Sequence, residues 1–273
     1  MITDFQDIPD PSLTMLGGWG HVCLTRDGFA ALMIRDCLHA RNAGIAIAPK
    51  LAFSMNGQAL SLAATDDTFN EAMQEADYIQ ADGQSLVIAS RYLCKNPLPE
   101  KIPTTDFFHN AAKIAQEHGL SFYIFGASPE DNKKTIENVT SLYPSLKIVG
   151  YRDGYFSEGD EESICEDIVT SGADVLWLGL GKPKEQLFCI RNKERLKGVG
   201  WIKTCGGLFD FLSDRNSRAP QWMQNAGLEW LYRTLQEPRR LFWRYSSTNI
   251  HTVYLLFKHG LTQKKYRTKI VTK

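Results

Sequence analysis

Residues 174–186, with the sequence DVLWLGLGKPKEQ, decide the fold class of this chain. The segment 174–180 is an apolar run of strand length, which predicts a strand buried on both faces of a sheet. Gly179 and Gly181 mark a turn, and Pro183 favours the first position of a helix, which we expect over 183–197. A buried strand, a short turn and a helix in this order indicate a βαβ unit.

The same alternation continues on both sides of this segment. It predicts an α/β fold: a Rossmann-like, mostly parallel sheet with helices on both faces. Ser128 before Pro129 indicates a helix start, and Thr104 or Thr105 is expected to cap another helix. The predicted strands cover 50–55, 77–80, 121–125, 147–150, 174–180 and 200–204, and the predicted helices include 27–41, 67–76, 85–93, 105–117, 158–170 and 183–197.

Three regions are expected along the chain. Residues 1–20 show little periodicity and predict a loose lead-in, residues 21–217 form the α/β domain, and residues 218–273 form a helical C-terminal appendage. Pro238 should break or kink the appendage, giving helices over 221–236 and 239–260. The segment 206–212 predicts one further short helix after the last strand.

The net charge of zero hides a strong asymmetry. The appendage holds eleven basic and two acidic residues, a net charge of +9, which leaves −9 on residues 1–217. Nine aromatic residues accompany the basic ones. Such a segment is typical of a helix in a membrane interface, although a core-packing helix with a solvated basic side explains it equally well. The neutral total argues against nucleic acid as a partner.

Several familiar signatures are absent. The six cysteines have no zinc-ligand spacing and are expected to be small buried hydrophobes in a reducing cytoplasm. No leader pattern and no run of eighteen apolar residues is found. A D-x-D pair is missing, the six histidines form no evident metal set, and we expect neither a metal nor a cofactor.

Candidate site residues lie at the predicted carboxyl ends of strands, where parallel sheets bind ligands. Asp82 is a candidate general base, with a helix N-cap as the commoner alternative. The turn at 179–186 is a weak phosphate site or only a tight turn. Asp210 and Arg218 could pair or contact a ligand. The appendage arginines suit diphosphate oxygens or anionic lipid, and they are Arg218, Arg233, Arg239, Arg240 and Arg244.

In order, the motifs of this chain resemble those of the WecG/TagA/CpsF glycosyltransferases, glycosyltransferase family 26. The resemblance covers residues 25–245. It rests on Ser54-Met55-Asn56, Ala81-Asp82-Gly83, IPTTD at 102–106, YIFG at 123–126, Tyr143-Pro144, IVGYRDGYF at 148–156, GLGKPKEQ at 179–186, GGLFDFL at 206–212, RAP at 218–220, GLEWLYR at 227–233 and EPRR at 237–240.

The resemblance implies an inverting, metal-independent transferase that moves a hexosyl group, of N-acetylmannosaminyl or glucosyl type, from a UDP-sugar. The implied acceptor is a polyprenyl-diphosphate-linked saccharide used in exopolysaccharide, capsule or cell-wall synthesis. Asp82 matches the general base, Ser54 a hydroxyl position that is threonine in many members, and Arg233 and Arg240 the arginines of the appendage. The implied substrate-binding residues are Asn56, Gly83, Asp106, Gly126, Tyr151, Lys184, Glu185, Gln186, Gly206, Gly207, Asp210 and Arg218.

The resemblance also implies a location: in the cytoplasm, peripheral on the inner face of the cytoplasmic membrane, with an anionic membrane surface as a partner. A homo-oligomer is left open. Two alternatives remain at this point. One is a nucleotide-binding dehydrogenase, suggested by the βαβ pattern and Gly179-x-Gly181, although the full dinucleotide fingerprint is missing. The other is a non-enzymatic scaffold whose basic tail binds lipid.

Overall fold

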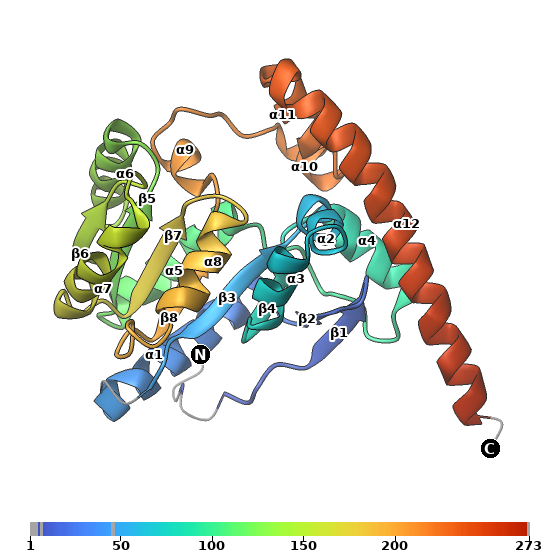
Figure 1. Cartoon of the computed structure of the whole chain (residues 1–273), viewed down its shortest axis with the longest axis horizontal. Helices are drawn as coiled ribbons and strands as arrows, with labels where there is room; N and C mark the ends of the chain where they lie inside the picture. Colours follow the sequence, from blue (N-terminus) through green and yellow to red (C-terminus); the bar gives the residue numbers. More distant parts are fainter. Residues whose placement is uncertain (1–4, 6–7, 45–46, 272–273) are drawn as a thin grey trace.

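The computed structural model describes residue 5, residues 8–44 and residues 47–271; for residues 240, 244, 245 and 261–271 it describes the backbone alone. Its centre is a six-stranded sheet in the order β4-β3-β8-β7-β5-β6, and every neighbouring pair is parallel (Figure 1). The strands are β3 (Lys50–Met55), β4 (Tyr78–Ala81), β5 (Ser121–Gly126), β6 (Lys147–Arg152), β7 (Val175–Gly179) and β8 (Trp201–Thr204).

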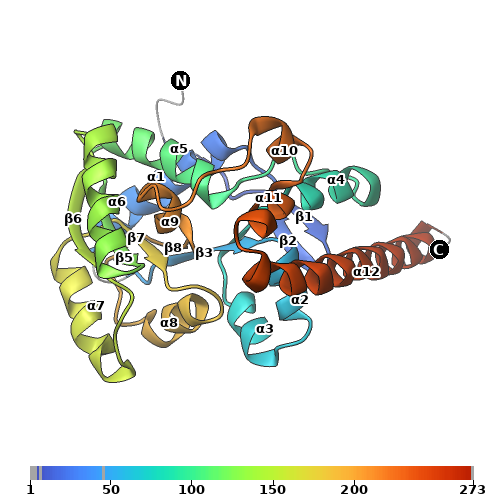
Figure 2. The same ribbon diagram turned by 90° about the horizontal axis from the view of Figure 1, so that it is seen from above.

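Helices cover both faces of this sheet, so the predicted fold class is confirmed. Side chains of β7 alternate: Val175 and Trp177 pack into one apolar cluster, and Leu176 and Leu178 into the other. One face is covered by α1 (Arg26–Ala43), α5 (Thr104–Glu117) and α6 (Pro129–Leu142), and the other by α3 (Asp67–Gln74), α7 (Glu161–Thr170) and α8 (Lys184–Asn192) (Figure 2). A short 3₁₀ turn, η3 (Glu158–Asp160), precedes α7.

The helix starts agree only in part with the sequence. Ser128 caps α6 as predicted, because its Oγ accepts the N–H of Asp131 at 3.1 Å and Pro129 takes the first turn. The predicted threonine cap of α5 is wrong, since the N-cap is Pro103 and Thr104 is already helical. The helices α2 (Gly57–Ala63), which the sequence did not predict, and α4 (Gln84–Leu93) follow β3 and β4 directly.

The loose lead-in expected over residues 1–20 is wrong for its second half. β1 (Leu13–Leu16) and β2 (Trp19–Val22) form an antiparallel hairpin. Its two turn residues, Gly17 and Gly18, have φ angles of +62° and +89°, which suits the tight two-residue turns of hairpins. The glycines therefore mark a hairpin turn rather than irregular chain.

The C-terminal appendage is helical, with boundaries that differ from the prediction. The expected helix over 221–236 is two helices, α10 (Gln221–Asn225) and α11 (Glu229–Gln236), because Gly227 has φ +73° between them. The predicted break at Pro238 is confirmed, since α11 ends at Gln236 and α12 (Pro238–Val271) begins at Pro238, although α12 continues past the expected end at residue 260. The predicted short helix after β8 is α9 (Leu208–Leu212), and α8 ends at Asn192 rather than at 197.

The helix α12 packs one side against the body and exposes the other. Thr252 Oγ1 donates to the Gly57 carbonyl at 2.7 Å, and the His251 ring hydrogen-bonds Ser61 at 2.8 Å. Its exposed side carries Trp243 and Ile250, which are 77% and 74% exposed. Within the described residues, no helix combines the length and apolar character needed to cross a bilayer.

The cysteines agree with the sequence interpretation in part. All six are free thiols; Cys37, Cys165, Cys189 and Cys205 are buried, and Cys23 and Cys94 are half-buried. Burial raises the pKa of the four buried thiols above the usual value, so they stay protonated. They pack as small apolar side chains.

Candidate active site

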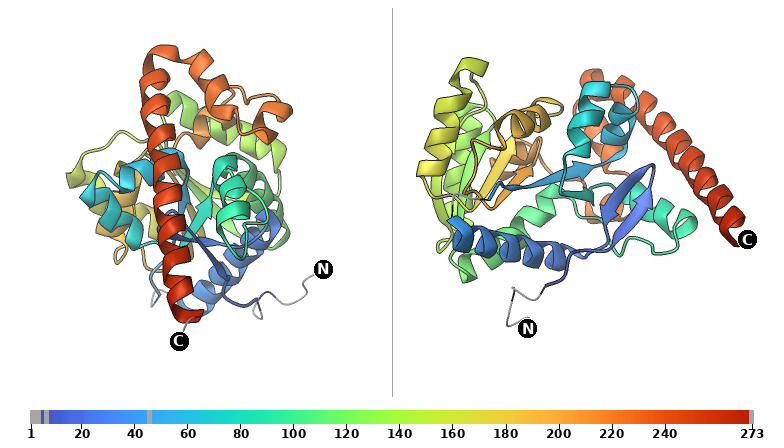
Figure 3. Two further views of the ribbon diagram at one scale, coloured as in Figure 1. Left: turned by 90° about the vertical axis from the view of Figure 1, so that its right-hand side faces the viewer. Right: turned by 60° about the horizontal axis from the view of Figure 1, so that its bottom comes forward.

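A cavity of about 1070 Å³ lies at the carboxyl ends of β3, β4 and β8, and residues of α10–α12 contribute to its wall. This is the edge at which parallel sheets bind ligands, and the volume is at the upper end for a ligand site. The long helix α12 runs across this side of the body (Figure 3). Nine of the residues singled out from the sequence line it: Ser54, Asn56, Asp82, Gly83, Glu185, Gly206, Gly207, Asp210 and Arg233.

Asp82 follows β4 directly, and its carboxylate is held from two sides. Its Oδ1 accepts the N–H of Thr104 at 3.2 Å, and its Oδ2 accepts from Asn56 Nδ2 at 3.4 Å. The alternative role as N-cap of the following helix is wrong, because α4 is capped by Gly83 without a side-chain bond. Asp82 instead joins the ends of β3 and β4 to the start of α5, and it lies in the cavity wall.

Beneath Asp82 lies a buried polar cluster that sequence reasoning missed. Lys203, fully buried in β8, donates to Ser54 Oγ at 2.9 Å and to the Thr204 carbonyl at 2.6 Å. Ser54 Oγ in turn hydrogen-bonds Thr104 Oγ1 at 2.8 Å. An ammonium group has no acceptor, so the Gln80 amide must present its oxygen, which then accepts from Lys203 at 3.0 Å.

Burial governs the charge of this lysine. It lowers the pKa of Lys203 to about 8, against the opposing influence of the Cys205, Asp82 and Glu185 side chains. None of the ion pairs among the described residues includes Lys203. The only sequence signal was a lysine next to Trp201 and Ile202 in the predicted strand over 200–204, and such a lysine is rarely buried.

Glu185 occupies the glycine turn at 179–186, which the sequence suggested for phosphate, and also reaches the glycine turn after β8. Its Oε2 accepts the N–H groups of Gly181 and Gly206, at 3.2 and 2.9 Å. The side chain is 1% exposed, and burial raises the pKa of its carboxyl group. Its neighbours point elsewhere: Gln186 is buried against Glu185, and Lys184 lies over the Phe156 ring, 4.1 Å from the ring centre.

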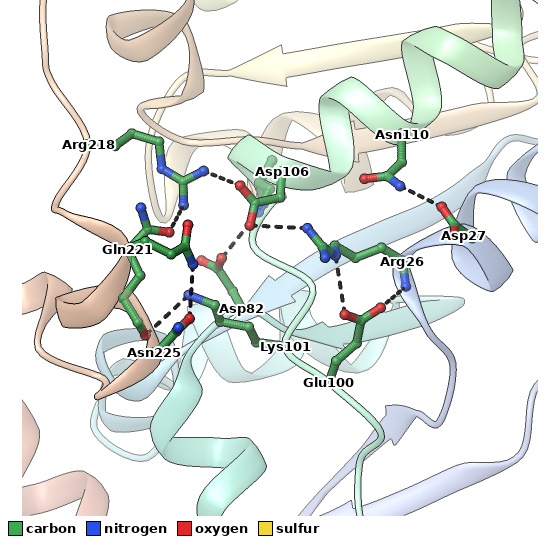
Figure 4. A network of polar contacts seen from close by, with 12 residues as sticks. Arg26, Asp27, Asp82, Glu100, Lys101, Asp106, Asn110, Arg218, Gln221 and Asn225 are labelled. Carbon is green, nitrogen blue, oxygen red and sulfur yellow. Dashed lines mark hydrogen bonds and ion pairs between the residues drawn. The ribbon is translucent and has the colours of Figure 1, made fainter.

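Asp106 and Arg218 come together in an ion-pair network at the start of α5 (Figure 4). Arg218 pairs with one carboxylate oxygen of Asp106, and Arg26 lies 3.5 Å from the other. Arg218 also donates to Gln224 at 2.8 Å. The pair therefore ties the entry of the appendage to the α/β domain, beside the cavity rather than in its lining.

The other predicted residues lie in different surroundings. Gly126, with φ +142°, packs so closely on β7 that an added Cβ would lie 2.2 Å from the Gly179 oxygen. Tyr151 is on the edge strand β6 and is 57% exposed. Arg233 lines the cavity and lies over the Phe211 ring at 5.4 Å. The side chain of Arg240 is outside the described residues.

In the part of the chain that the structure describes, no three His, Cys, Asp or Glu side chains are grouped to hold a metal ion. The positive groups of the cavity wall are side chains, Lys101, Lys182 and Arg233. The cavity wall also contains carboxylates, and two of them, Asp82 and Glu185, are held by hydrogen bonds. A fixed carboxylate beside cations suits proton abstraction next to an anionic ligand.

Comparison with known proteins identifies the family. A protein of Bacillus subtilis (strain 168), the N-acetylglucosaminyldiphosphoundecaprenol N-acetyl-beta-D-mannosaminyltransferase, is 30% identical over 187 residues, which are 68% of this chain and 72% of the relative. The family model of the glycosyl transferase WecG/TagA/CpsF family matches residues 23–266 and so includes every residue of the cavity wall. The chain therefore belongs to the WecG/TagA/CpsF family of glycosyl transferases.

Proposed function

We propose that this protein transfers a sugar from a UDP-sugar to a polyprenyl-diphosphate-linked saccharide, with inversion and without a metal ion. The product would enter a cell-surface polysaccharide. The observation that carries the proposal is the Asp82 carboxylate, fixed by Asn56 and Thr104 in the wall of the cavity. The substrate named for the Bacillus relative, a diphosphoundecaprenol-linked sugar, supports the acceptor class.

In this mechanism Asp82 is the general base. Its carboxylate takes the proton of the acceptor hydroxyl as the hydroxyl oxygen forms a bond to the anomeric carbon of the donor. The bond from that carbon to the diphosphate oxygen breaks, and UDP leaves with the bonding electrons. The hydrogen bonds from Thr104 and Asn56 hold the carboxylate in one orientation, so little reorganisation is needed when the proton moves.

The charge that develops on the leaving diphosphate needs a positive environment. Lys182 and Arg233 supply it from the cavity wall in this proposal, which gives a transferase without a D-x-D pair a way to stabilise UDP. A carbon–oxygen bond is exchanged for another, so the reaction requires no redox cofactor. The donor is expected to carry an N-acetylmannosaminyl or glucosyl group.

The basic, aromatic appendage supports a peripheral location on the inner face of the cytoplasmic membrane. Its exposed apolar side chains, Trp243 and Ile250 among them, lie on the side of α12 that faces away from the body. The family assignment favours this enzyme over the dehydrogenase and the non-enzymatic scaffold. Binding of UDP but not NAD, together with sugar-nucleotide turnover, would support the same choice.

The test is Asp82→Asn in the purified full-length protein, with UDP release measured in the presence of a lipid-linked acceptor. Loss of the base should lower kcat by roughly 10²–10⁴. Asp67→Asn, an exposed carboxylate in the first turn of α3, is the matched control and should keep wild-type activity. Activity of Asp82→Asn within a few-fold of wild type would refute the assignment.

A further inference from the structure

The cavity has two chemically different ends. Its inner end is polar and contains Asp82, Ser54 and the glycine turns at the carboxyl ends of the strands. Its outer end lies between α4 and α12, and the side chains there are mostly apolar. From α4 these are Ile88, Ala89, Tyr92 and Leu93, and from α12 they are Val253, Leu256 and Phe257.

Helical spacing explains why these side chains form a continuous wall. Positions 88, 89, 92 and 93 share one face of α4, and positions 249, 252, 253, 256 and 257 share one face of α12. The two helices approach closely at Gly260, where an added Cβ would lie 3.1 Å from the Leu93 side chain. The two faces thus bound a groove that leads into the polar end; we call it the α4–α12 groove.

The wall of this groove is exposed although it is apolar. Ile88 is 40% exposed, Tyr92 80%, Val253 53% and Phe257 58%. A contiguous exposed apolar surface of this kind marks an interaction site. Ile250, three residues before Val253 on α12, is 74% exposed but does not line the cavity, so the groove wall ends between these two side chains.

We propose that the α4–α12 groove binds the isoprenoid chain of the acceptor, next to its diphosphate. The inference rests on the proposed function, and its basis is the continuity of the groove with the catalytic end. One ligand that fills both ends must carry a sugar at Asp82, an anionic group within reach of a cation of the wall such as Lys101, and an apolar chain against α4 and α12. A lipid-diphosphate-linked saccharide has these three parts in that order.

Binding of the isoprenoid chain in the groove predicts an effect of chain length that contact with a bilayer surface alone does not predict. If the first isoprene units lie between α4 and α12, the enzyme distinguishes acceptors by chain length even in detergent solution. Loss of the contact between one branched side chain and the isoprenoid chain should lower kcat/KM by about 10-fold, since burial of one methylene group strengthens binding by about 4-fold.

The experiment compares two acceptors with the same diphosphate and saccharide, one on an undecaprenyl chain and one on a short, water-soluble alkyl chain. Ile88→Ser and Val253→Ser should lower kcat/KM about 10-fold for the long chain and less than about 2-fold for the short one. Both sites are partly exposed, so folding should be kept. Ile250→Ser, on the same helix but outside the cavity, is the control and should change neither value.

Two results would overturn the proposal that the groove binds the isoprenoid chain: an equal loss of kcat/KM with both acceptors, or the same loss in Ile250→Ser as in Val253→Ser. Neither result would contradict the proposed transferase activity. Failure of the proposed function is a different result, namely no UDP release by the wild-type protein with either acceptor. In that case the binding of geranylgeranyl diphosphate, measured by calorimetry, tests whether the groove binds an isoprenoid chain. Binding that Ile88→Ser and Val253→Ser weaken supports the groove, and unchanged binding overturns it.

Discussion

At the scale of single residues, the site divides into side chains that the sequence indicated and side chains that only the fold reveals. Asp82 could be found because it follows a strand and precedes a glycine, which places it at the ligand-binding edge. Lys203 could not, because its partners Ser54 and Gln80 come from two other strands. Pairings between strands far apart in the sequence leave no local pattern.

Lys203 gives a prediction for the pH dependence of stability. Its pKa is about 8 in the folded protein and 10.5 in the unfolded chain, so between these values the unfolded state binds more protons. The contribution of Lys203 to the free energy of unfolding must therefore rise with pH from about 8 to 10.5. In urea titrations over that range, wild type should gain stability relative to Lys203→Met. A constant difference in the free energy of unfolding between the two proteins would contradict this prediction.

Gly126 gives a second prediction at this scale. In Gly126→Ala the new Cβ would meet the backbone of Gly179, and the φ of +142° adds strain, so the protein should lose more than about 3 kcal/mol of stability. Gly172→Ala is the matched control, because Gly172 also has a positive φ of +69° but no atom within 4 Å of an added Cβ. Gly172→Ala should lose only about 1 kcal/mol of stability, and thermal unfolding measures both variants.

At the scale of elements, the prediction succeeded where one local signal was enough. The strand over 174–180 is β7, and the Ser128–Pro129 helix start is α6, because apolar runs and caps act over a few residues. The hairpin of β1 and β2 was missed since Gly17-Gly18 is a loop signal unless its flanking segments are seen to pair. The α10–α11 break depended likewise on a single glycine, Gly227.

The hairpin should make the protein sensitive to acid. His21 in β2 is fully buried, and burial lowers its pKa from 6.5 to about 4. Between these values the unfolded chain binds the proton and the folded protein does not, so stability falls as pH drops from 6.5 towards 4. In urea titrations, wild type should lose stability relative to His21→Leu over this range; a constant difference between the two proteins would rule out His21 as the cause.

At the scale of the whole molecule, the charge asymmetry coincides with the architecture. The segment with a charge of +9 contains α10–α12, and α12 both contributes to the cavity wall and exposes apolar side chains such as Trp243 and Ile250. The two interpretations of this tail, core packing and membrane contact, therefore concern different residues of one helix. The sequence could not separate them, because helix periodicity alone does not show which side meets the body.

Removal of the appendage is the prediction at this scale. A chain ending at Pro220 loses one wall of the cavity, including Arg233 and Val253. It keeps all six sheet strands and, apart from Leu255 and Leu256, the two apolar clusters that flank them. We expect a folded body by circular dichroism with little UDP release. Full activity of this shortened protein would refute the role of the appendage in the reaction.

Glu185 has a consequence for the binding of anions. As part of α8, its carboxylate is a ligand tethered beside the amides of Gly181 and Gly206, and its effective concentration there is in the millimolar range or above. Free phosphate or a nucleotide competes with this internal anion for the same two N–H groups. We therefore expect Glu185 to keep free anions off the two N–H groups. Glu185→Ala, which removes the acceptor oxygen, should bind inorganic phosphate more tightly than wild type in calorimetric titrations, and equal binding by the two proteins would contradict this.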